Sequence, residues 1–384
     1  MVEMEYMMKI SWNFDSGNIE IVEIIGNQAN LKIRSDANSE FKQWFHFRCM
    51  GEAGVEQQLS ITNVNECSYV EGWKDYQAVA SYDAETWFRV NTRYDGEALK
   101  ITHTPEQNSI FYAYFAPYSL DRHTKLLHSS QNSALCEMST IGTTVDGRDL
   151  DLLHIKSQSD SDSENANLKT AWIIARQHPG ESMAEWCSEG VLARLLDEDD
   201  AIARALLQHW QFFVVPNMNP DGSTRGHLRA NSAGANLNRE WLEPSEESSP
   251  EVFYVREQMK QQGCDLFLDL HGDEAIPYTF VAGSEGIPSF NQEMADKQKR
   301  FTDELLKSSP DFQTVHGYPV PKPGKADLSM ASNWVGENFK CLALTVEMPF
   351  KDHLLLEDTV FGWSPERSKL LGEALIAAIY AYSI

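Results

Sequence analysis

ARQHPGESMAEW, residues 175–186, stands where a run of apolar residues ends and a helical pattern begins. The preceding LKTAWIIARQH, residues 168–178, has the length and apolar content of a buried strand, and residues 181–196 carry apolar residues at helical spacing. Pro179 and Gly180 are turn-forming residues, so the chain is expected to reverse between strand and helix. His178 then ends the strand and Glu181 follows the turn, which places both side chains at one crevice.

The same alternation of strand and helix continues toward the C-terminus. Residues 211–217, 264–272, 278–283 and 341–350 have strand patterns, and residues 201–210, 250–263, 289–308 and 364–382 have helical patterns. Upstream, Ser119 is a helix N-cap candidate for a helix to about Ser130, a hairpin is expected at Asp146-Gly147, and SQSDSDSENAN, residues 157–167, is expected to be a polar loop. This order predicts an α/β domain with a mostly parallel sheet.

The first hundred or so residues have a different character. Short alternating runs such as GNIEIVEIIGNQANLKIRSD, residues 17–36, are separated by Gly, Asn and Asp. Such spacing is typical of an antiparallel β-sandwich. With 384 residues, the chain is too long for one comfortable core, so two domains are expected, over residues 1–112 and 113–384.

The composition argues against two classes of binding partner. The formal net charge of −25 repels nucleic acid and anionic membranes, so neither is expected as a partner. No apolar run is long enough for a membrane helix, and the first residues do not resemble a secretory signal. The six cysteines lack CxxC spacing, so we expect a cytoplasmic protein with free thiols. The sequence does not specify an oligomeric state.

Three ionisable side chains follow apolar strand patterns directly. They are His178, His271 and Glu347. Ligands of open α/β sheets bind at the carboxyl ends of strands, so these residues are expected to meet in space. His178, Glu181 and His271 would form a set of two histidines and one carboxylate, which is used by catalytic zinc and leaves a fourth position for water. Cobalt, manganese or iron would also suit these ligands.

A long glycine-rich loop, NPDGSTRGHLRANSAGANLNREW, residues 219–241, lies between the histidines. Its composition is suited to binding an anion. Arg239 can bind a carboxylate through two hydrogen bonds and Asn238 can add a third, while Arg229 could polarise a carbonyl beside a metal ion.

HPGE, NPDG, NLNREW, DLHGD and LTVEMPF occur in this order, and together they resemble the zinc carboxypeptidase family. The preceding β-rich region and YFAPYS, residues 114–119, resemble its cytosolic carboxypeptidase branch, which includes enzymes that remove glutamates from tubulin tails. The resemblance implies an α/β/α domain with a mixed, mostly parallel, eight-stranded sheet, and one Zn²⁺ per chain.

The resemblance also implies roles for single residues. His178, Glu181 and His271 would be the zinc ligands. Glu347 would be the general base on the zinc-bound water and would then protonate the leaving amine. Arg229 would stabilise the oxyanion, and the pair Asn238 and Arg239 would bind the terminal carboxylate of the substrate.

Some positions differ from the family pattern. Gly180 stands where the pancreatic enzymes have an arginine, and Asp273-Glu274 replaces a second histidine of the cytosolic branch. The mobile tyrosine of the family has no assigned match, with Tyr318 the nearest. Lys322, Lys325 and Arg225 are cationic candidates for recognising an acidic C-terminal residue, or else ordinary exposed loop residues.

The expected function is therefore metallocarboxypeptidase activity on the C-termini of peptides or proteins, with a preference for glutamate as one expectation. Two alternatives stay open at this point. One is a zinc deacylase or amidase acting on N-acyl amino acids or cell-wall peptides, and the other is a non-catalytic module that keeps zinc for structure. Glu347 argues against the second, because metal binding alone does not need it.

Overall fold

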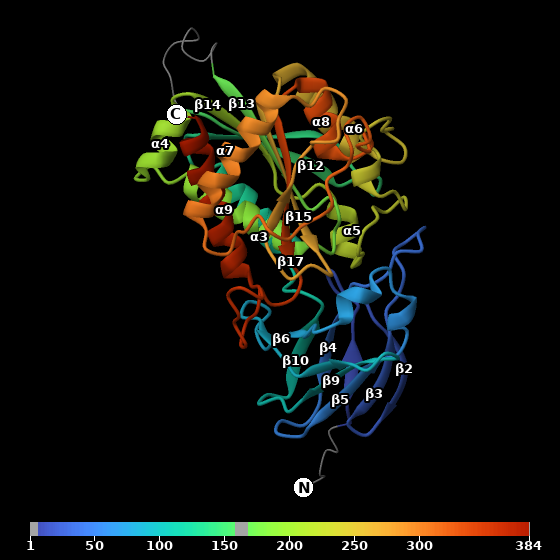
Figure 1. The fold of residues 1–384 in the computed structure, drawn as a ribbon. Coiled ribbons are helices and arrows are strands. Elements are labelled where there is room, and N and C mark those ends of the chain that lie inside the picture. Colours follow the sequence, from blue (N-terminus) through green and yellow to red (C-terminus); the bar gives the residue numbers. More distant parts are fainter. Residues whose placement is uncertain (1–6, 158–167, 384) are drawn as a thin grey trace.

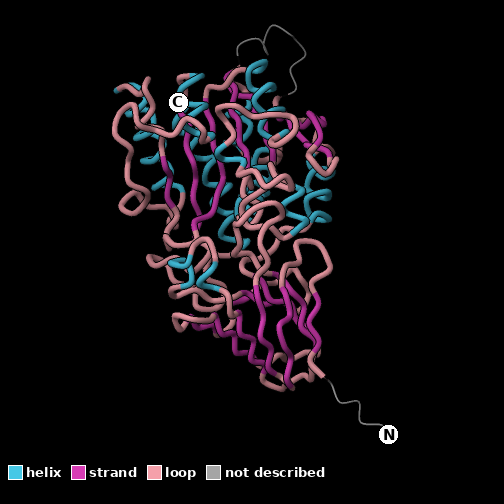
Figure 2. Tube along the Cα trace, turned by 90° about the vertical axis from the view of Figure 1, so that its right-hand side faces the viewer, coloured by secondary structure: helices cyan, strands magenta, loops and turns pink. Residues whose placement is uncertain are grey.

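A computed structural model of the chain describes residues 7–157 and 168–383. The N-terminal part folds into two five-stranded sheets, ordered β1-β4-β10-β6-β7 and β2-β3-β5-β9-β8. Figure 2 shows these strands at one end of the molecule, below the larger layers of helix and strand. The strands are β1 Lys9–Ser11, β2 Glu20–Ile25, β3 Gln28–Lys32, β4 His46–Met50, β5 Gln57–Ile61, β6 Val79–Ser81, β7 Phe88–Arg89, β8 Thr92–Tyr94, β9 Leu99–His103 and β10 Ser109–Ala113.

The N-terminal sandwich is confirmed, with one difference in strand direction. Every pair in the two sheets is antiparallel except β3 and β5, which are parallel. The chain between them passes through β4 in the other sheet, so it returns to β5 in the same direction as β3. The positions of turn residues in the sequence do not indicate that the chain crosses to the other sheet between β3 and β5.

The larger part is built on a mixed sheet in the order β11-β12-β14-β13-β15-β17-β16. Its four central strands, β14, β13, β15 and β17, run parallel, while β11, β12 and β16 are antiparallel to their neighbours. The bounds are β11 Cys136–Thr143, β12 Asp149–Ile155, β13 Lys169–Ala175, β14 Trp210–Val215, β15 Leu266–Asp273, β16 Phe280–Ala282 and β17 Leu342–Pro349.

The described residues give this sheet seven strands rather than the eight expected. Next to β16, the described residues form one isolated bridge, between Thr279 and Phe312. Pro310, which has no N–H to donate to a ladder, lies two residues before Phe312. The segment therefore does not extend into an eighth strand.

Helices cover both faces of the sheet (Figure 1). On one face lie α3, α4, α7 and α9, and on the other α5, α6 and α8. The bounds are α1 Leu120–Ser130, α3 Ser182–Leu195, α4 Ala201–Leu207, α5 Pro220–Arg225, α6 Pro250–Gln262, α7 Gln292–Ser308, α8 Ala331–Phe339 and α9 Pro365–Ser383; short 3₁₀ turns span Val64–Glu66, Val70–Trp73 and Leu237–Arg239.

Several local predictions are confirmed. The side chain of Ser119 accepts a hydrogen bond from Arg122 N and caps α1, and β11 and β12 form a hairpin around Gly147. The predicted polar loop lies outside the described residues at positions 158–167. The division into residues 1–112 and 113–384 stays a prediction.

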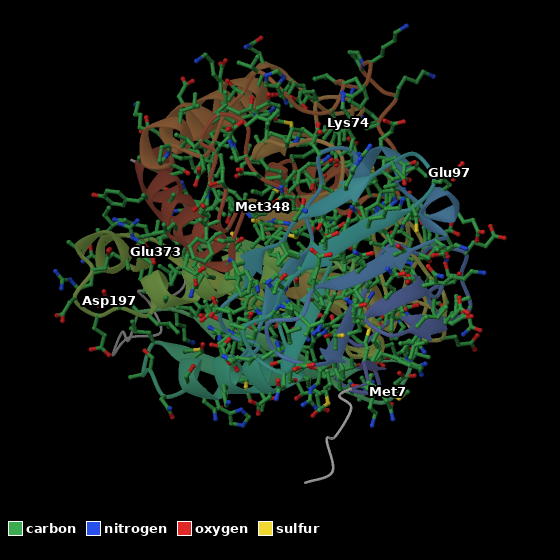
Figure 3. All side chains as sticks on the ribbon, turned by 90° about the horizontal axis from the view of Figure 1, so that it is seen from below. Met7, Lys74, Glu97, Asp197, Met348 and Glu373 are labelled. Atoms are coloured by element: carbon green, nitrogen blue, oxygen red, sulfur yellow. The ribbon has the colours of Figure 1, made fainter. Side chains whose placement is uncertain are left out.

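The described residues contain no helix that is both long and apolar enough to cross a membrane. Many charged side chains lie at the surface, while others, such as Arg176 and Glu185, are buried. Figure 3 shows Lys74, Glu97 and Asp197 at the rim of the molecule, where all three are exposed.

Two glycines allow α3 and α9 to pack closely. A Cβ atom added to Gly190 would lie 2.0 Å from Lys369 O, and one added to Gly372 would lie 2.1 Å from Cys187 O. The backbones therefore approach to a distance that no larger residue permits.

We expect Gly190→Ala to lower the free energy of unfolding by about 1–3 kcal/mol, because the new methyl group meets a backbone carbonyl. In an unhindered helix the same change would stabilise by about 1 kcal/mol, so the sign of the effect identifies the contact. Urea titration measures it. Ala193→Ser, at an exposed position of the same helix, is the control and should change stability by less than about 0.5 kcal/mol. A Gly190→Ala protein as stable as the parent would contradict this packing.

Candidate metal centre and active site

The central parallel strands bring the predicted strand-end residues together. β15 lies between β13 and β17, and His271 is the register partner of Glu347 across β15 and β17. β13 ends at Ala175 rather than at His178, because Arg176 adopts a left-handed backbone with φ 62°. The turn that follows carries His178 toward the end of β15.

The side chains of His178, Glu181 and His271 form one buried cluster whose ligand atoms lie within 4.8 Å of one another. One oxygen of Glu181, Oε1, lies 2.7 Å from His178 Nδ1, and the other, Oε2, lies 2.8 Å from His271 Nδ1. Gly272 N also donates to Oε2, at 3.1 Å. The carboxylate thus faces both imidazoles, and the three donors converge on one point.

Outer partners fix the orientation of both imidazole rings. His178 Nε2 lies 3.0 Å from Asn236 Oδ1, and His271 Nε2 lies 2.8 Å from Asp269 Oδ2. If each Nε2 carries the proton, each Nδ1 presents a lone pair toward the cluster, which is the tautomer that a metal ligand needs.

Asp269 is held in turn by Gln177, whose Nε2 donates to it at 2.7 Å, and Gln177 Oε1 accepts from Trp241 Nε1 at 2.8 Å. Sequence reasoning missed Asn236 and Asp269. The sequence contained a signal for Asp269, because this residue lies two positions before His271 in one strand. The two side chains therefore point to the same face of the sheet. Asn236 lies in a loop and had none.

The electrostatics of the cluster suit a cation. Burial lowers the pKa of His178 to about 4, so its imidazole is neutral at pH 7. Burial also opposes the charged form of His271, but the carboxylates of Asp269 and Glu181 outweigh it and hold the pKa of His271 well above its usual value. Two imidazoles and a carboxylate are a donor set that fits zinc, so these three residues could hold the ion that the sequence predicts.

Contacts made by Arg176 and the close approach at Gly180 shape the turn before α3. Arg176 is fully buried, donates to Tyr118 O and Pro179 O at 2.9 Å each, and pairs with Glu185 at 2.6 Å. A Cβ atom on Gly180 would lie 2.9 Å from Leu228 O. The approach of the Leu228 backbone therefore explains why no arginine occupies position 180.

Glu347 lies beside the cluster with one oxygen free of protein partners. Its Oε1 accepts a hydrogen bond from the Tyr318 hydroxyl at 3.1 Å, while Oε2 is buried and has no partner among the described residues. Burial raises the pKa of Glu347 to about 8. A carboxyl group with this pKa can both accept and return a proton near neutral pH.

Tyr318 is therefore part of the site, although the sequence left the tyrosine unassigned. The same hydroxyl lies 2.7 Å from Asp273 Oδ2, and because it has a single proton it donates to one of the two carboxylates at a time. Asp273 Oδ1 accepts from two backbone N–H groups. The two acidic residues that differ from the family pattern thus have different surroundings. Asp273 orients Tyr318, whereas Glu274 is buried near Arg229, and burial raises its pKa well above the usual value.

The two predicted arginines lie at the same site. Arg229 is half-buried between the rings of Phe41 and Tyr69, with the guanidinium carbon 5.6 and 5.5 Å from the ring centres. Arg239 is 3.8 Å from Asp327, and its pKa is lowered by burial and by the charge of Arg229. Two neighbouring guanidinium groups attract an anion.

The remaining candidates have other surroundings. Asn238 is buried, and its Oδ1 accepts from Ala331 N at 2.8 Å, so only its amide Nδ2 can donate to a carboxylate. Arg225 forms two hydrogen bonds with Asp146, at 2.8 and 3.0 Å, and is engaged there. Lys322 and Lys325 are exposed and form no ion pair with the described residues.

Comparison with known proteins agrees with the two parts of the fold. The family described as cytosolic carboxypeptidase N-terminal domain matches residues 10–115, and the family described as zinc carboxypeptidase matches residues 125–374. An uncharacterized protein of Zymomonas mobilis is 45% identical over 97% of this chain and 96% of its own length.

Solved structures are similar over the whole chain. A metallo-carboxypeptidase from Burkholderia cenocepacia has 47% identity and a TM-score of 0.95, covering 98% of this chain and 99% of its own. A metallo-carboxypeptidase from Pseudomonas aeruginosa, solved in complex with (2-guanidinoethylmercapto)succinic acid, has 44% identity and a TM-score of 0.93, covering 97% and 98%.

We expect Asp269→Asn to weaken zinc binding about 10- to 100-fold, because His271 loses the carboxylate that orients its ring. His271→Ala should abolish most binding. Competition with a chelator of known affinity measures both without an activity assay. Glu347→Gln is the control and should bind zinc within about threefold of the parent, since Glu347 is not one of the three residues of the cluster. Unchanged affinity in Asp269→Asn would refute the orienting role.

Proposed function

Since this chain belongs to the zinc carboxypeptidase family and is a peptide hydrolase, we propose that it removes single residues from the C-termini of peptides or proteins by the residues described above. The observation that carries the proposal is the position of Glu347. Its unpartnered Oε2 is buried beside His271, next to a cluster that fits zinc.

In this proposal His178, Glu181 and His271 hold the ion. Zinc bound there would act as a Lewis acid that polarises the peptide carbonyl and acidifies a water molecule. Every other step belongs to side chains of the chain itself.

Glu347 takes a proton from the attacking water at Oε2 and returns it to the nitrogen of the leaving residue. Addition of the water oxygen to the carbonyl carbon forms the new C–O bond first, and the C–N bond then breaks as its nitrogen receives the proton. The products are a shortened peptide and a free amino acid. Tyr318 donates to the other oxygen, Oε1, and so fixes the plane of the carboxyl group while the proton is transferred.

Arg229 stabilises the negative charge that develops on the carbonyl oxygen. Arg239, with the Nδ2 group of Asn238, binds the terminal carboxylate, so that only a chain end fills the site. The proximity of the two guanidinium groups supports this assignment, because an anion between them relieves their repulsion.

We expect the zinc-loaded protein to release one C-terminal residue at a time from unstructured peptides, with products identified by mass. A chelator should stop release, and zinc should restore it. Glu347→Gln should lower the turnover rate about 10²- to 10⁴-fold while zinc stays bound, because the proton acceptor is lost.

Parent-like turnover in Glu347→Gln would exclude the proposed proton transfer. Hydrolysis of N-acyl amino acids without any release from peptides would favour the deacylase alternative. The comparisons support a peptide hydrolase over the non-catalytic module.

A preference for C-terminal glutamate is part of the proposal. Lys322 and Lys325 support it, because both are exposed and form no ion pair with the described residues. The compound bound to the Pseudomonas relative is a succinic acid with a guanidino group, so it offers two carboxyl groups to a cationic site and one cation to an acidic site. Peptides ending in lysine or arginine therefore belong in the same panel.

We expect kcat/KM for peptides ending in glutamate to exceed that for glutamine. The combined change Lys322→Ser and Lys325→Ser should reduce this ratio about two- to fivefold, the range for exposed charge pairs. Arg225→Ser is the matched control, since Arg225 already pairs with Asp146, and it should leave the ratio unchanged. A parent enzyme that prefers lysine or arginine would contradict the glutamate proposal.

A further inference from the structure

The loop that carries Arg229 is bound by the N-terminal domain. The carboxylate of Asp36 accepts hydrogen bonds from three successive backbone N–H groups of this loop. Oδ1 accepts from Leu228 N at 2.7 Å, and Oδ2 accepts from Arg229 N and Ala230 N at 2.8 Å each. Asp36 itself is buried, with 3% of its surface exposed.

Three convergent N–H groups are an anion-binding arrangement of the backbone. Each bond to a charged acceptor is stronger than a bond between neutral groups. The loop conformation from Leu228 to Ala230 therefore depends on a charge from another domain. Without Asp36, three N–H donors would lose their shared acceptor in a buried place, which is costly.

The same segment of the N-terminal domain also contacts the functional side chain. Asp36 N donates to Phe41 O at 2.7 Å, so residues 36–41 form a closed turn. The ring of Phe41 lies against the Arg229 guanidinium, and Tyr69 lies against it as well. Cation–π contacts of this kind fix the plane and direction of a guanidinium group.

A neighbouring histidine adds a second link. His227 Nε2 accepts from Ala37 N at 2.9 Å, while its Nδ1 lies 2.9 Å from Ala230 O. The imidazole thus bridges the turn of the N-terminal domain and the far end of the same three-residue segment.

The other side of the loop contacts the turn between the two cluster residues His178 and Glu181. Gly180 N donates to Leu228 O at 2.8 Å, one residue before the ligand Glu181. The backbone of Leu228 is therefore held at its N–H by Asp36 and at its carbonyl by the turn between His178 and Glu181. Through this residue, the N-terminal domain sets the position of Arg229 relative to the metal ligands.

We propose that the N-terminal domain is a working part of the active site, and that Asp36 is the positioning residue through which it places Arg229. This inference rests on the proposed role of Arg229 in stabilising the carbonyl oxygen. Asp36 touches no reacting atom and acts through the loop backbone.

A double-mutant cycle in the zinc-loaded full chain tests the coupling, with the peptide that the parent hydrolyses fastest. Asp36→Asn keeps the size of the side chain but turns an amide N–H₂ group toward the loop donors. We expect it to lower kcat about 10- to 100-fold with KM changed less than threefold. Arg229→Met alone should cost about 10²- to 10³-fold, as expected for loss of an oxyanion donor.

In the Arg229→Met background, Asp36→Asn should cost less than threefold, because the group that it positions is already gone. Equal factors in both backgrounds would overturn the proposal, and so would parent-like kcat in Asp36→Asn. A parent-like Arg229→Met would instead refute the proposed role of Arg229, which distinguishes the two failures.

A control variant distinguishes an effect on the position of Arg229 from a general weakening of the contact between the N-terminal sandwich and the rest of the chain. Arg89 also crosses that interface, where it donates to Phe350 O, Phe361 O and Trp363 O. Arg89→Met should lower the melting temperature but keep kcat within about twofold in the folded protein. A loss of kcat in Arg89→Met equal to that in Asp36→Asn would show a merely structural effect and overturn the proposal.

Hydrogen exchange provides a readout that needs no substrate. In Asp36→Asn the amides of residues 228–230 should exchange at least tenfold faster than in the parent, while those of β13 stay protected. Unchanged exchange at these amides would overturn the proposal even if no peptide were hydrolysed.

If Asp36→Asn fails to fold, Phe41→Leu tests the same placement with every Asp36 hydrogen bond intact. It should lower kcat about three- to tenfold in the parent and less than twofold in the Arg229→Met background. Equal losses in both backgrounds, or no loss in either, would overturn the proposal.

Discussion

The parallel pairing of β13, β15 and β17 is the constraint on which the rest of the site depends. It brings the ends of three strands from distant parts of the sequence to one edge, and it makes His271 and Glu347 direct neighbours. A shift of one residue in β17 would turn Glu347 to the opposite face of the sheet. On one face of the sheet, Gly190 and Gly372 allow α3 and α9 to pack closely against each other.

Much of the site could be predicted because its residues lie in regular elements or directly at their ends. Runs of apolar residues indicated the strands, and His178 and His271 come directly after two of these runs in the sequence. Residues from loops were harder to find, since periodicity carries no information there. Asn236 and Tyr318 reach the site from loops, and the parallel pair β3 and β5 depends on a crossover between sheets. Among the described residues, the expected eighth strand is reduced to a single bridge at Phe312, close to Pro310.

The site concentrates opposite charges in a chain with a net charge of −25. The carboxylate of Glu181 lies against both histidines and that of Asp269 against His271, whereas Arg229 and Arg239 lie where a substrate would enter in the proposed function. A uniformly acidic surface would repel an acidic peptide, so the two arginines must supply local positive potential within the Debye length, about 8 Å at physiological ionic strength. Binding of such a peptide is therefore sensitive to salt.

The two backbone hydrogen bonds of Leu228 have a consequence for how the whole chain loses its structure. Separating the N-terminal sandwich from the mixed sheet would break three charge-assisted hydrogen bonds to Asp36, together about 5 kcal/mol, and would expose the ring of Phe41. That cost is comparable with the entire stability of a typical domain, about 5–15 kcal/mol. The contacts at Asp36 therefore favour cooperative unfolding of the sandwich together with the mixed sheet.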